Sequence, residues 1–506
     1  MLDPGKPARL LGSLLILAVL VVAGYLVLRH RGRAAPPPAA GEAYGRAAVS
    51  ADLPAADDLR AVAREANVVV CVIDAARADH VGCYGYARDT TPNIDRLAGS
   101  GTAFEQHFSQ YPETKMSTAC LFTSQYPDTH LAYGDRRLAE STFTLAQGLR
   151  AAGLHTVLFS QNGYASPMWG LGEEFDEAYY EPHLKEAGRD LPDIWRPEAL
   201  LEQVECWLEK RPRSRFFAYV HFMPPHDPYI APPGTRRYFA GQQPPEAWLS
   251  DYAFDEVERE RRAKERPWSE QHQGWMLNLY DGNLRYADWA VGELERLLRE
   301  AGAFESTVLI VTSDHGEAFG EHGYRGHTFS AYDETIRIPL IIKLPRLNVA
   351  GRRISALTQS VDVMPTVLDL FEAPYPRDGV QGRSLLPLMT GEAGEVNDYV
   401  FARAAGQPPS YVIRSHDWML VLYRGGQLRA LYDLKEDPRA LQNVIESRPE
   451  EAGRMVEAFR AFARSQTAPP LQFVDSDARR PQLPEVNKIE VNEEMRRSLE
   501  ALGYLR

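Results

Sequence analysis

The stretch TVLIVTSDHGEAFGEHG, residues 307–323, decides the fold of this chain. Its first part, residues 307–311, is an apolar and β-branched run typical of a buried strand. Asp314 and His315 follow at the point where such a strand ends. A carboxylate beside an imidazole at that point has the composition of half a metal site.

A second strand of the same kind, VVVCVI at residues 68–73, ends at Asp74. In open α/β sheets, ligands bind outside the carboxyl ends of the parallel strands. Two strands that bring metal-binding side chains to the same end therefore predict one shared site, built from Asp74, Asp314 and His315.

Strand-like runs alternate with helical stretches from about residue 67 to residue 344, which predicts an α/β fold with a doubly wound, mainly parallel sheet. One helix is supported by apolar residues at three- and four-residue steps, Leu284, Ala287, Val291, Leu294 and Leu298, with Gly302 at its end. Beyond about residue 395, short alternating segments predict antiparallel strands, followed by a helix near residues 449–464. These form a small C-terminal α+β subdomain.

The N-terminal residues 10–28, LLGSLLILAVLVVAGYLVL, carry no charge and approach the roughly 20 residues that a transmembrane helix needs. The run is longer than the apolar core of a signal peptide and lacks a small-residue cleavage site before Arg29, which predicts an uncleaved single-pass anchor. The flanking basic residues, two before the run and three after it, slightly favour a cytoplasmic body.

Changes in composition along the sequence predict the boundaries of five segments. We expect an anchor at 1–33, a Pro/Ala-rich linker at 34–64, the main α/β domain at 65–395, the C-terminal subdomain at 396–475 and a tail at 476–506. The formal net charge of −13 argues against nucleic acid as a partner, because binding a phosphate backbone needs a basic surface.

The ordered motifs of the chain resemble those of the sulfatase family within the alkaline phosphatase superfamily. They begin with NVVVCVIDAARADH at residue 67, continue through YVHFMPPHDPY and TSDHGEAFGEHGYRGH, and include LYDLKEDPRALQNV. The resemblance covers essentially everything from Asn67 onward. It implies an alkaline phosphatase-like fold and a metal-dependent enzyme that acts on ester bonds.

The resemblance also locates the nucleophile. In the family it begins a Cys-x-Pro-Ser-Arg motif whose cysteine is oxidised to formylglycine, and this motif aligns with residues 114–118, TKMST. The nucleophile position is therefore Thr114. Formylglycine acts as a hydrate whose second hydroxyl expels sulfate, whereas threonine has one hydroxyl. A threonine adduct must be released by attack on the central atom, a route that the superfamily uses with phosphorus through phosphothreonine.

By the same resemblance, one divalent metal ion is bound by Asp74, Thr114, Asp314 and His315. The metal would make the Thr114 hydroxyl alkoxide-like and polarise a phosphoryl oxygen. Sulfatases usually have a second aspartate where this chain has Ala75, and Asp-Asn where it has Asp314-His315. A nitrogen ligand and one fewer carboxylate favour Zn²⁺ or Mn²⁺, with Ca²⁺ and Mg²⁺ as alternatives.

The usual sulfate pocket is not visible in the sequence. Ser160, Gln161 and Asn162 stand where the family carries Lys-x-His, and Thr118 replaces the motif arginine. A helix that starts at Ser117 would instead contribute the favourable field of its amino end to an anion.

Two histidines remain as candidates for contacts with the substrate. His226 lies in the PPHDPY loop and His327 lies near the basic pocket position of the family. Either could contact a phosphoryl oxygen or protonate the leaving alkoxide, and motif context favours this over a structural role. Arg77 either pairs with acidic groups of the site or contacts the substrate, and His322 could equally be a loop histidine without a role.

The leading hypothesis is a membrane-anchored, metal-dependent hydrolase that cleaves a phosphate or phosphonate ester of a small molecule, lipid or glycan through Thr114. The alternatives are a sulfatase with an unconverted nucleophile, a transferase that moves a phosphoryl head group to an envelope acceptor, and a catalytically silent tethered binding module. Anchored relatives generally face outward, so the resemblance implies a periplasmic or extracellular catalytic domain. The sequence leaves the oligomeric state open.

Overall fold

The computed structural model describes residues 53–171, 174–180, 196–211, 214–227, 229, 232–236, 238–239, 270–346, 351–405, 410–423 and 427–466. The predicted anchor, most of the predicted linker and the predicted tail lie outside these residues. Among the helices that the structure describes, none is both long and apolar enough to cross a membrane.

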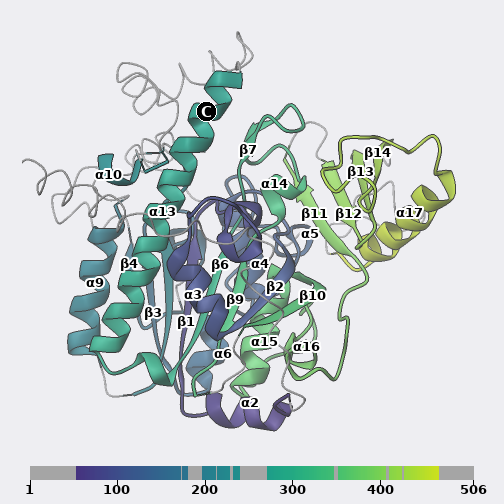
Figure 1. Cartoon of the computed structure of the whole chain (residues 1–506). Helices are drawn as coiled ribbons and strands as arrows, with labels where there is room; N and C mark the ends of the chain where they lie inside the picture. The colour runs from purple at the N-terminus through teal and green to yellow at the C-terminus, as the bar shows by residue number, and fades with distance from the viewer. Residues whose placement is uncertain are drawn as a thin grey trace, which may run out of the picture. The chain divides into compact units, whose positions relative to one another are not determined.

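The centre of the fold is an eight-stranded sheet with the order β10-β2-β9-β6-β1-β5-β3-β4 (Figure 1). The middle strand β1 pairs in parallel with both β5 and β6. Strand β9 runs antiparallel to its neighbours β2 and β6. The strands are β1 (Asn67–Ile73), β2 (Thr102–Phe108), β3 (His155–Ser160), β4 (Glu177–Tyr180), β5 (Phe216–Phe222), β6 (Thr307–Ser313), β9 (Leu340–Lys343) and β10 (Arg352–Gln359). The predicted mainly parallel α/β sheet is confirmed.

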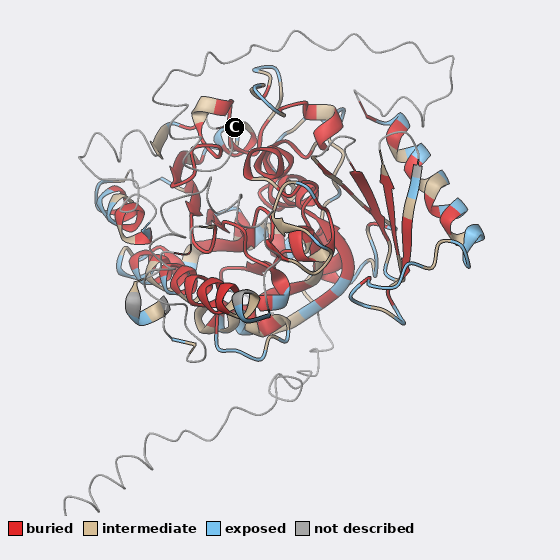
Figure 2. Cartoon of the chain, turned by 90° about the horizontal axis from the view of Figure 1, so that it is seen from above, coloured by how far each residue is buried: buried red, intermediate tan, exposed pale blue. Residues whose placement is uncertain are grey.

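Helices cover both faces of this sheet because successive side chains of a strand point in opposite directions. Val68, Val70 and Val72 of β1 belong to one apolar core, and Val69, Cys71 and Ile73 belong to another. The first core includes α2 (Ala56–Ala63), α4 (Thr114–Thr123), α6 (Leu145–Ala151), α15 (Val363–Leu370) and α16 (Leu386–Thr390); the second includes α3 (Pro92–Ser100), α9 (Pro197–Lys210) and α13 (Glu270–Glu300). Both layers are buried on their inner sides (Figure 2).

Two helices differ from expectation in extent. The helix predicted from the spacing of Leu284 to Leu298 is present, but α13 already begins at Glu270. Its first half is anchored by the buried Met276 and Leu279. Helix α2 occupies residues assigned to the linker, because Leu59 and Ala63 are fully buried against the first core.

A second, antiparallel sheet follows the main one in the chain, with the order β11-β12-β13-β14. Helix α17 packs on it through Ala452, Met455, Phe459 and Ala463, which share one helix face. The bounds are β11 (Val400–Ala404), β12 (Ser410–Arg414), β13 (Trp418–Tyr423), β14 (Gln427–Asp433) and α17 (Pro449–Arg464). The antiparallel strands and the helix predicted here are confirmed.

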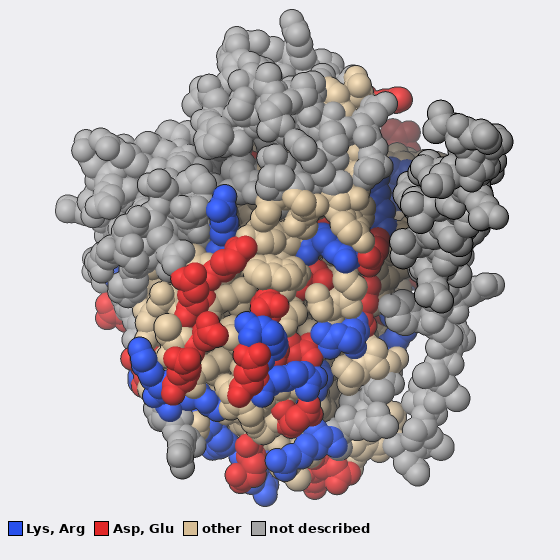
Figure 3. Space-filling view, turned by 60° about the vertical axis from the view of Figure 1, so that its left-hand side comes forward, with Lys and Arg blue, Asp and Glu red and all other residues tan. Residues whose placement is uncertain are grey.

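Short elements complete the described chain. They are α5 (Pro127–His130), α10 (Pro233–Arg236), α14 (Asp333–Ile336), the hairpin of β7 (Ala318–Phe319) and β8 (Arg325–Gly326), and several single turns of 3₁₀ helix. On the face seen in Figure 3, acidic and basic side chains of the described residues are interspersed. Ion pairs along α13, such as Arg296 with Glu300 at 2.6 Å, follow the same pattern.

His322, in the hairpin between β7 and β8, contacts both α14 and the loop after β14. Its Nδ1 lies 2.7 Å from Glu334 Oε1, and its Nε2 lies 3.0 Å from the carbonyl oxygen of Ala440. The ring stacks on Tyr332 with centroids 3.7 Å apart. Both nitrogens face acceptors, so the doubly protonated imidazolium fits this place best. Burial alone lowers the pKa of His322, but the Glu334 carboxylate raises it above its ordinary value.

We expect His322→Gln to lower the free energy of unfolding by about 1.5–3 kcal/mol at pH 6, the range for hydrogen bonds to charged groups. A histidine with a raised pKa stabilises the fold fully below its unfolded pKa of about 6.5, and this contribution is lost as the pH rises through the folded value. The deficit of the variant should therefore shrink at alkaline pH. Urea unfolding from pH 6 to pH 9 measures it.

His416→Gln provides the matched control, because His416 also faces a carboxylate, Glu395 at 3.1 Å, but both side chains are largely exposed. This control should change stability very little at any pH. An equal effect of the two substitutions, or a deficit of His322→Gln that does not depend on pH, would contradict the role of the His322 imidazolium.

Candidate active site

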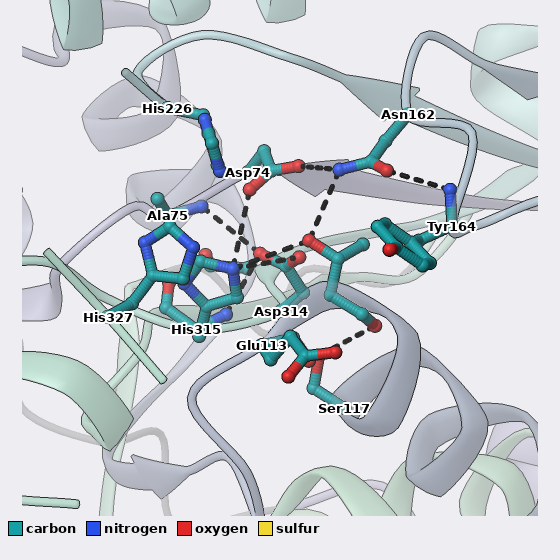
Figure 4. Close-up of polar contacts among 12 residues, drawn as sticks. Asp74, Ala75, Glu113, Ser117, Asn162, Tyr164, His226, Asp314, His315 and His327 are labelled. Carbon is teal, nitrogen blue, oxygen red and sulfur yellow. Dashed lines mark hydrogen bonds and ion pairs between the residues drawn. The ribbon is translucent and has the colours of Figure 1, made fainter. Parts of the chain in front are cut away.

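The carboxyl ends of the neighbouring parallel strands β6, β1 and β5 lie together at one edge of the sheet. Ile73 pairs with Ser313 on β6, so the next residues, Asp74 and Asp314, lie side by side. His221 of β5 lies opposite Val72 on the other side of β1. Figure 4 shows Asp74, Asp314 and His315 turned towards a common centre. The strand-end site predicted from these residues is therefore assembled.

In each of the two carboxylates, Asp74 and Asp314, one oxygen accepts hydrogen bonds from the protein and the other oxygen accepts none. Asp74 Oδ2 accepts from Asn162 Nδ2 at 2.7 Å and contacts His221 Nε2 at 3.0 Å. Asp314 Oδ1 accepts from the backbone amides of Ala75 and His315 at 3.1 and 2.9 Å. Asp74 Oδ1 and Asp314 Oδ2 are buried and make no hydrogen bond. Two unpaired carboxylate oxygens in a buried site favour a cation between them.

His315 supplies a nitrogen to the same centre. Its Nδ1 lies 2.9 Å from the carbonyl oxygen of Gly316, which can only accept, so Nδ1 carries the proton and Nε2 has a free lone pair. Nε2 lies 3.5 Å from Asp74 Oδ1, 3.6 Å from Asp314 Oδ2 and 3.4 Å from Thr114 Oγ1. Burial lowers the pKa of His315, which keeps the ring neutral and able to bind a metal. The four predicted metal-binding residues thus converge.

Thr114 is the first residue of α4, so this helix begins at the nucleophile position itself and not at Ser117. The side chain is completely buried, and its Oγ1 accepts a hydrogen bond of 3.2 Å from Asn162 Nδ2. The amino end of α4 therefore lies at the Thr114 hydroxyl, where its field favours negative charge.

His221 is a site residue that the sequence analysis did not single out. Asp74, His221 and Asp314 each offer an atom within 4.8 Å of the others, a spacing that could hold a metal ion. However, His221 Nε2 points at Asp74 Oδ2, while its Nδ1 meets the Tyr219 hydroxyl at 2.8 Å. Although burial lowers the pKa of His221, Asp74 raises it above its ordinary value. A proton on Nε2 makes His221 a support for Asp74, which leaves His315 as the nitrogen ligand.

His226 and His327 lie beside His315, on the opposite side of Asp74 from Asn162 (Figure 4). The ring centroids of His226 and His327 are 4.9 Å apart, and that of His327 is 4.4 Å from His315. His327 Nδ1 lies 3.4 Å from the buried Glu317. Burial lowers the pKa of His327, but the Glu317 carboxylate more than compensates and raises it to about 9. The structure thus brings both predicted histidines to the site.

Arg77 has different partners from those considered in the sequence analysis. Its guanidinium donates four hydrogen bonds, to the Asp79 and Glu321 carboxylates and to the carbonyl oxygen of Glu317. The side chain is only 6% exposed. These contacts fasten the loop after β6 to the loop after β1. They favour the structural alternative for Arg77 over a contact with substrate, because these donors are engaged within the protein.

The α/β fold with its buried strand-end cluster has an alkaline phosphatase-like architecture. The Sulfatase family profile matches residues 66–373, and a profile described as N-sulphoglucosamine sulphohydrolase, C-terminal, matches residues 320–458. The chain therefore belongs to the sulfatase family and is a hydrolase that acts on ester bonds.

Similar proteins include both sulfatases and phosphorus-ester hydrolases. An N-acetylglucosamine-6-O-sulfatase of Bacteroides thetaiotaomicron is 24% identical, with 81% of this chain and 87% of that protein covered. A multifunctional alkaline phosphatase superfamily protein of Trinickia caryophylli is 28% identical, with 64% and 77% covered. The solved phosphonate monoester hydrolase of Agrobacterium radiobacter has a TM-score of 0.66 at 22% identity, with 78% and 95% covered. The last similarity establishes the fold.

We expect His315→Ala to remove stoichiometric divalent metal from the purified protein, because it deletes an imidazole lone pair that faces both unpaired carboxylate oxygens. His221→Phe should weaken metal affinity by about 10–100-fold without abolishing binding, as expected for a residue that orients a ligand. Elemental analysis after dialysis and titration with Mn²⁺ or Zn²⁺ measure both effects.

His107→Phe is the matched control, since His107 is a fully buried histidine that contacts Thr358 at 3.0 Å. Its metal content should equal that of the unmodified chain. If His221→Phe lost the metal and His315→Ala kept it, the nitrogen ligand would be His221.

Proposed function

We propose that the chain hydrolyses a phosphate or phosphonate ester through a covalent intermediate on Thr114. The observation that carries this proposal is the position of the Thr114 hydroxyl, 3.4 Å from His315 Nε2, the nitrogen that also lies 3.5 and 3.6 Å from the unpaired oxygens of Asp74 and Asp314. A single hydroxyl at this point can form an adduct but has no second hydroxyl with which to expel sulfate. Phosphorus accepts direct attack by water in the second step.

The residues of the site suit a two-step displacement. Deprotonated Thr114 Oγ1 attacks phosphorus, the bond from phosphorus to the ester oxygen breaks, and the leaving alkoxide takes a proton from His327 or His226. In the second step water returns a proton to that histidine as its oxygen attacks phosphorus, the bond from phosphorus to Oγ1 breaks, and Oγ1 leaves as the alkoxide with which the cycle began. A divalent cation held by Asp74, Asp314 and His315 would supply the positive charge that favours a deprotonated hydroxyl and polarises the phosphoryl oxygen.

Two further observations support phosphorus over sulfur. Asn162, a neutral amide, contacts Thr114 in the segment where sulfatases carry Lys-x-His. In addition, phosphonate monoester hydrolases and a multifunctional alkaline phosphatase superfamily protein are among the similar proteins. Sulfuric ester hydrolysis is the second candidate, because most of the curated relatives are named as sulfatases.

The remaining assignments are also proposals. We favour Zn²⁺ or Mn²⁺ because a neutral imidazole with two carboxylates and a hydroxyl forms a mixed nitrogen and oxygen ligand set. We further propose that the apolar residues 10–28 anchor the enzyme with its catalytic domain on the periplasmic or extracellular side, where lipid or glycan esters are accessible.

The direct test compares an aryl phosphate, an aryl phosphate diester, an aryl phosphonate and an aryl sulfate with the full chain and added Mn²⁺ or Zn²⁺. We expect higher kcat/KM for at least one phosphorus ester than for the sulfate. Thr114→Ala should lower kcat by about 10³-fold or more, as does loss of other catalytic nucleophiles.

Thr123→Ala serves as control, because Thr123 lies at the other end of the same helix, where it donates to the carbonyl oxygen of Ala119 and accepts from the backbone amide of Gln125. It should retain near-normal turnover. Sulfate turnover above that of every phosphorus ester, or full activity of Thr114→Ala, would reject the proposed function.

A further inference from the structure

Asn162 is the fixed polar neighbour of the Thr114 hydroxyl. It follows β3 and is completely buried. Its Oδ1 accepts a hydrogen bond of 2.9 Å from the backbone amide of Tyr164. An amide N–H can only donate, so the atom that faces it must be the carbonyl oxygen of the side chain. The orientation of the amide is thereby determined, and its NH₂ group faces the catalytic centre (Figure 4).

The two N–H groups of Asn162 have two acceptors. Nδ2 lies 2.7 Å from Asp74 Oδ2 and 3.2 Å from Thr114 Oγ1. The same amide thus orients Asp74, so that Oδ1 is left for a cation, and contacts the reacting oxygen. Since Thr114 Oγ1 accepts from Asn162, the hydroxyl proton must point elsewhere, and His315 Nε2 is 3.4 Å away.

This contact acts differently on the two halves of the reaction. In the first half, Oγ1, once deprotonated, carries its negative charge before the attack and loses it as the bond to phosphorus forms. In the second half, charge returns to Oγ1 as that bond breaks, so the hydrogen bond from Asn162 strengthens towards the transition state. Only interactions that are stronger in the transition state than in the ground state accelerate a step.

We infer that Asn162 is a catalytic residue whose N–H stabilises the departing Thr114 oxygen and thereby speeds release of the covalent adduct. This role deepens the proposed function and rests on it. A neutral amide suits the task because it donates to Oγ1 without adding a positive charge that would compete with a cation for Asp74.

The experiment uses the full chain with Mn²⁺, and bis(4-nitrophenyl) phosphate and 4-nitrophenyl phenylphosphonate as probes. Their good leaving group makes the first step fast. In Asn162→Leu, which keeps the volume but removes both donors, we expect kcat to fall by about 10²–10³-fold, the effect of removing one oxyanion donor. A burst of nitrophenolate should approach one per chain, and mass spectrometry of quenched protein should find the adduct on Thr114.

Asn162→Ala is the second variant, for the case that leucine is not accommodated, and it should show the same burst. Asn397→Leu is the matched control: Asn397 is a buried asparagine whose Nδ2 also bridges a carboxylate, Asp362 at 2.8 Å, and an oxygen, the carbonyl of Leu357 at 3.1 Å. It should show no burst and a nearly unchanged kcat. Metal content and melting temperature are measured for every variant.

A fall in kcat without burst or adduct in both Asn162 variants would overturn the role in adduct release, as would an unchanged kcat. Failure of the proposed function has a different outcome. In that case Thr114→Ala would turn over the probes at the rate of the unmodified chain, or the adduct would be found on another residue.

Discussion

The interaction on which the site depends is the juxtaposition of two buried carboxylates, Asp74 and Asp314, at the ends of neighbouring parallel strands. Each holds one oxygen in hydrogen bonds to the protein and leaves the other unpaired. Unpaired carboxylate oxygens in a buried site are costly, so this arrangement favours a compensating cation. The surrounding groups fit such a cation. His315 directs a lone pair at the unpaired oxygens, whereas His221 and Asn162 direct N–H groups at Asp74 Oδ2, the oxygen that is already hydrogen-bonded.

The contacts of Thr114 fit its proposed role as the nucleophile. Thr114 lies at the amino end of α4, 3.4 Å from His315 Nε2, and accepts a hydrogen bond from Asn162. A hydroxyl is a weak nucleophile at neutral pH and needs positive charge and hydrogen-bond donors to act as an alkoxide. Arg77 holds the loop after β6, which carries His315, through the carbonyl oxygen of Glu317, and His322 joins the β7–β8 hairpin to the loop after β14. Residues outside the Asp74–Asp314 cluster therefore help to hold the segments that follow β6.

Much of this could be predicted from the sequence. The apolar runs that precede Asp74 and Asp314 identify buried strands, and the ordered motifs locate Thr114, His226 and His327. Local sequence patterns were less informative where burial decides whether a helix forms. Helix α2 forms within the predicted linker because Leu59 and Ala63 pack against the first apolar core. Helix α4 begins at Thr114 and not at Ser117, since the position of a helix end depends on the contacts of its first turn.

The sequence by itself determined the fold class, the family resemblance and the strand-end residues, because hydrophobic periodicity and motif order are local properties of the chain. The tertiary structure decided which polar groups meet. Asn162 and His221 contact Asp74 across 88 and 147 residues of sequence, and they do so because β3, β5 and β1 are neighbours in the sheet. The pairing of Arg77 with Glu321 spans 244 residues. Strand order and burial create these contacts, and neither can be read from the spacing of residues along the chain.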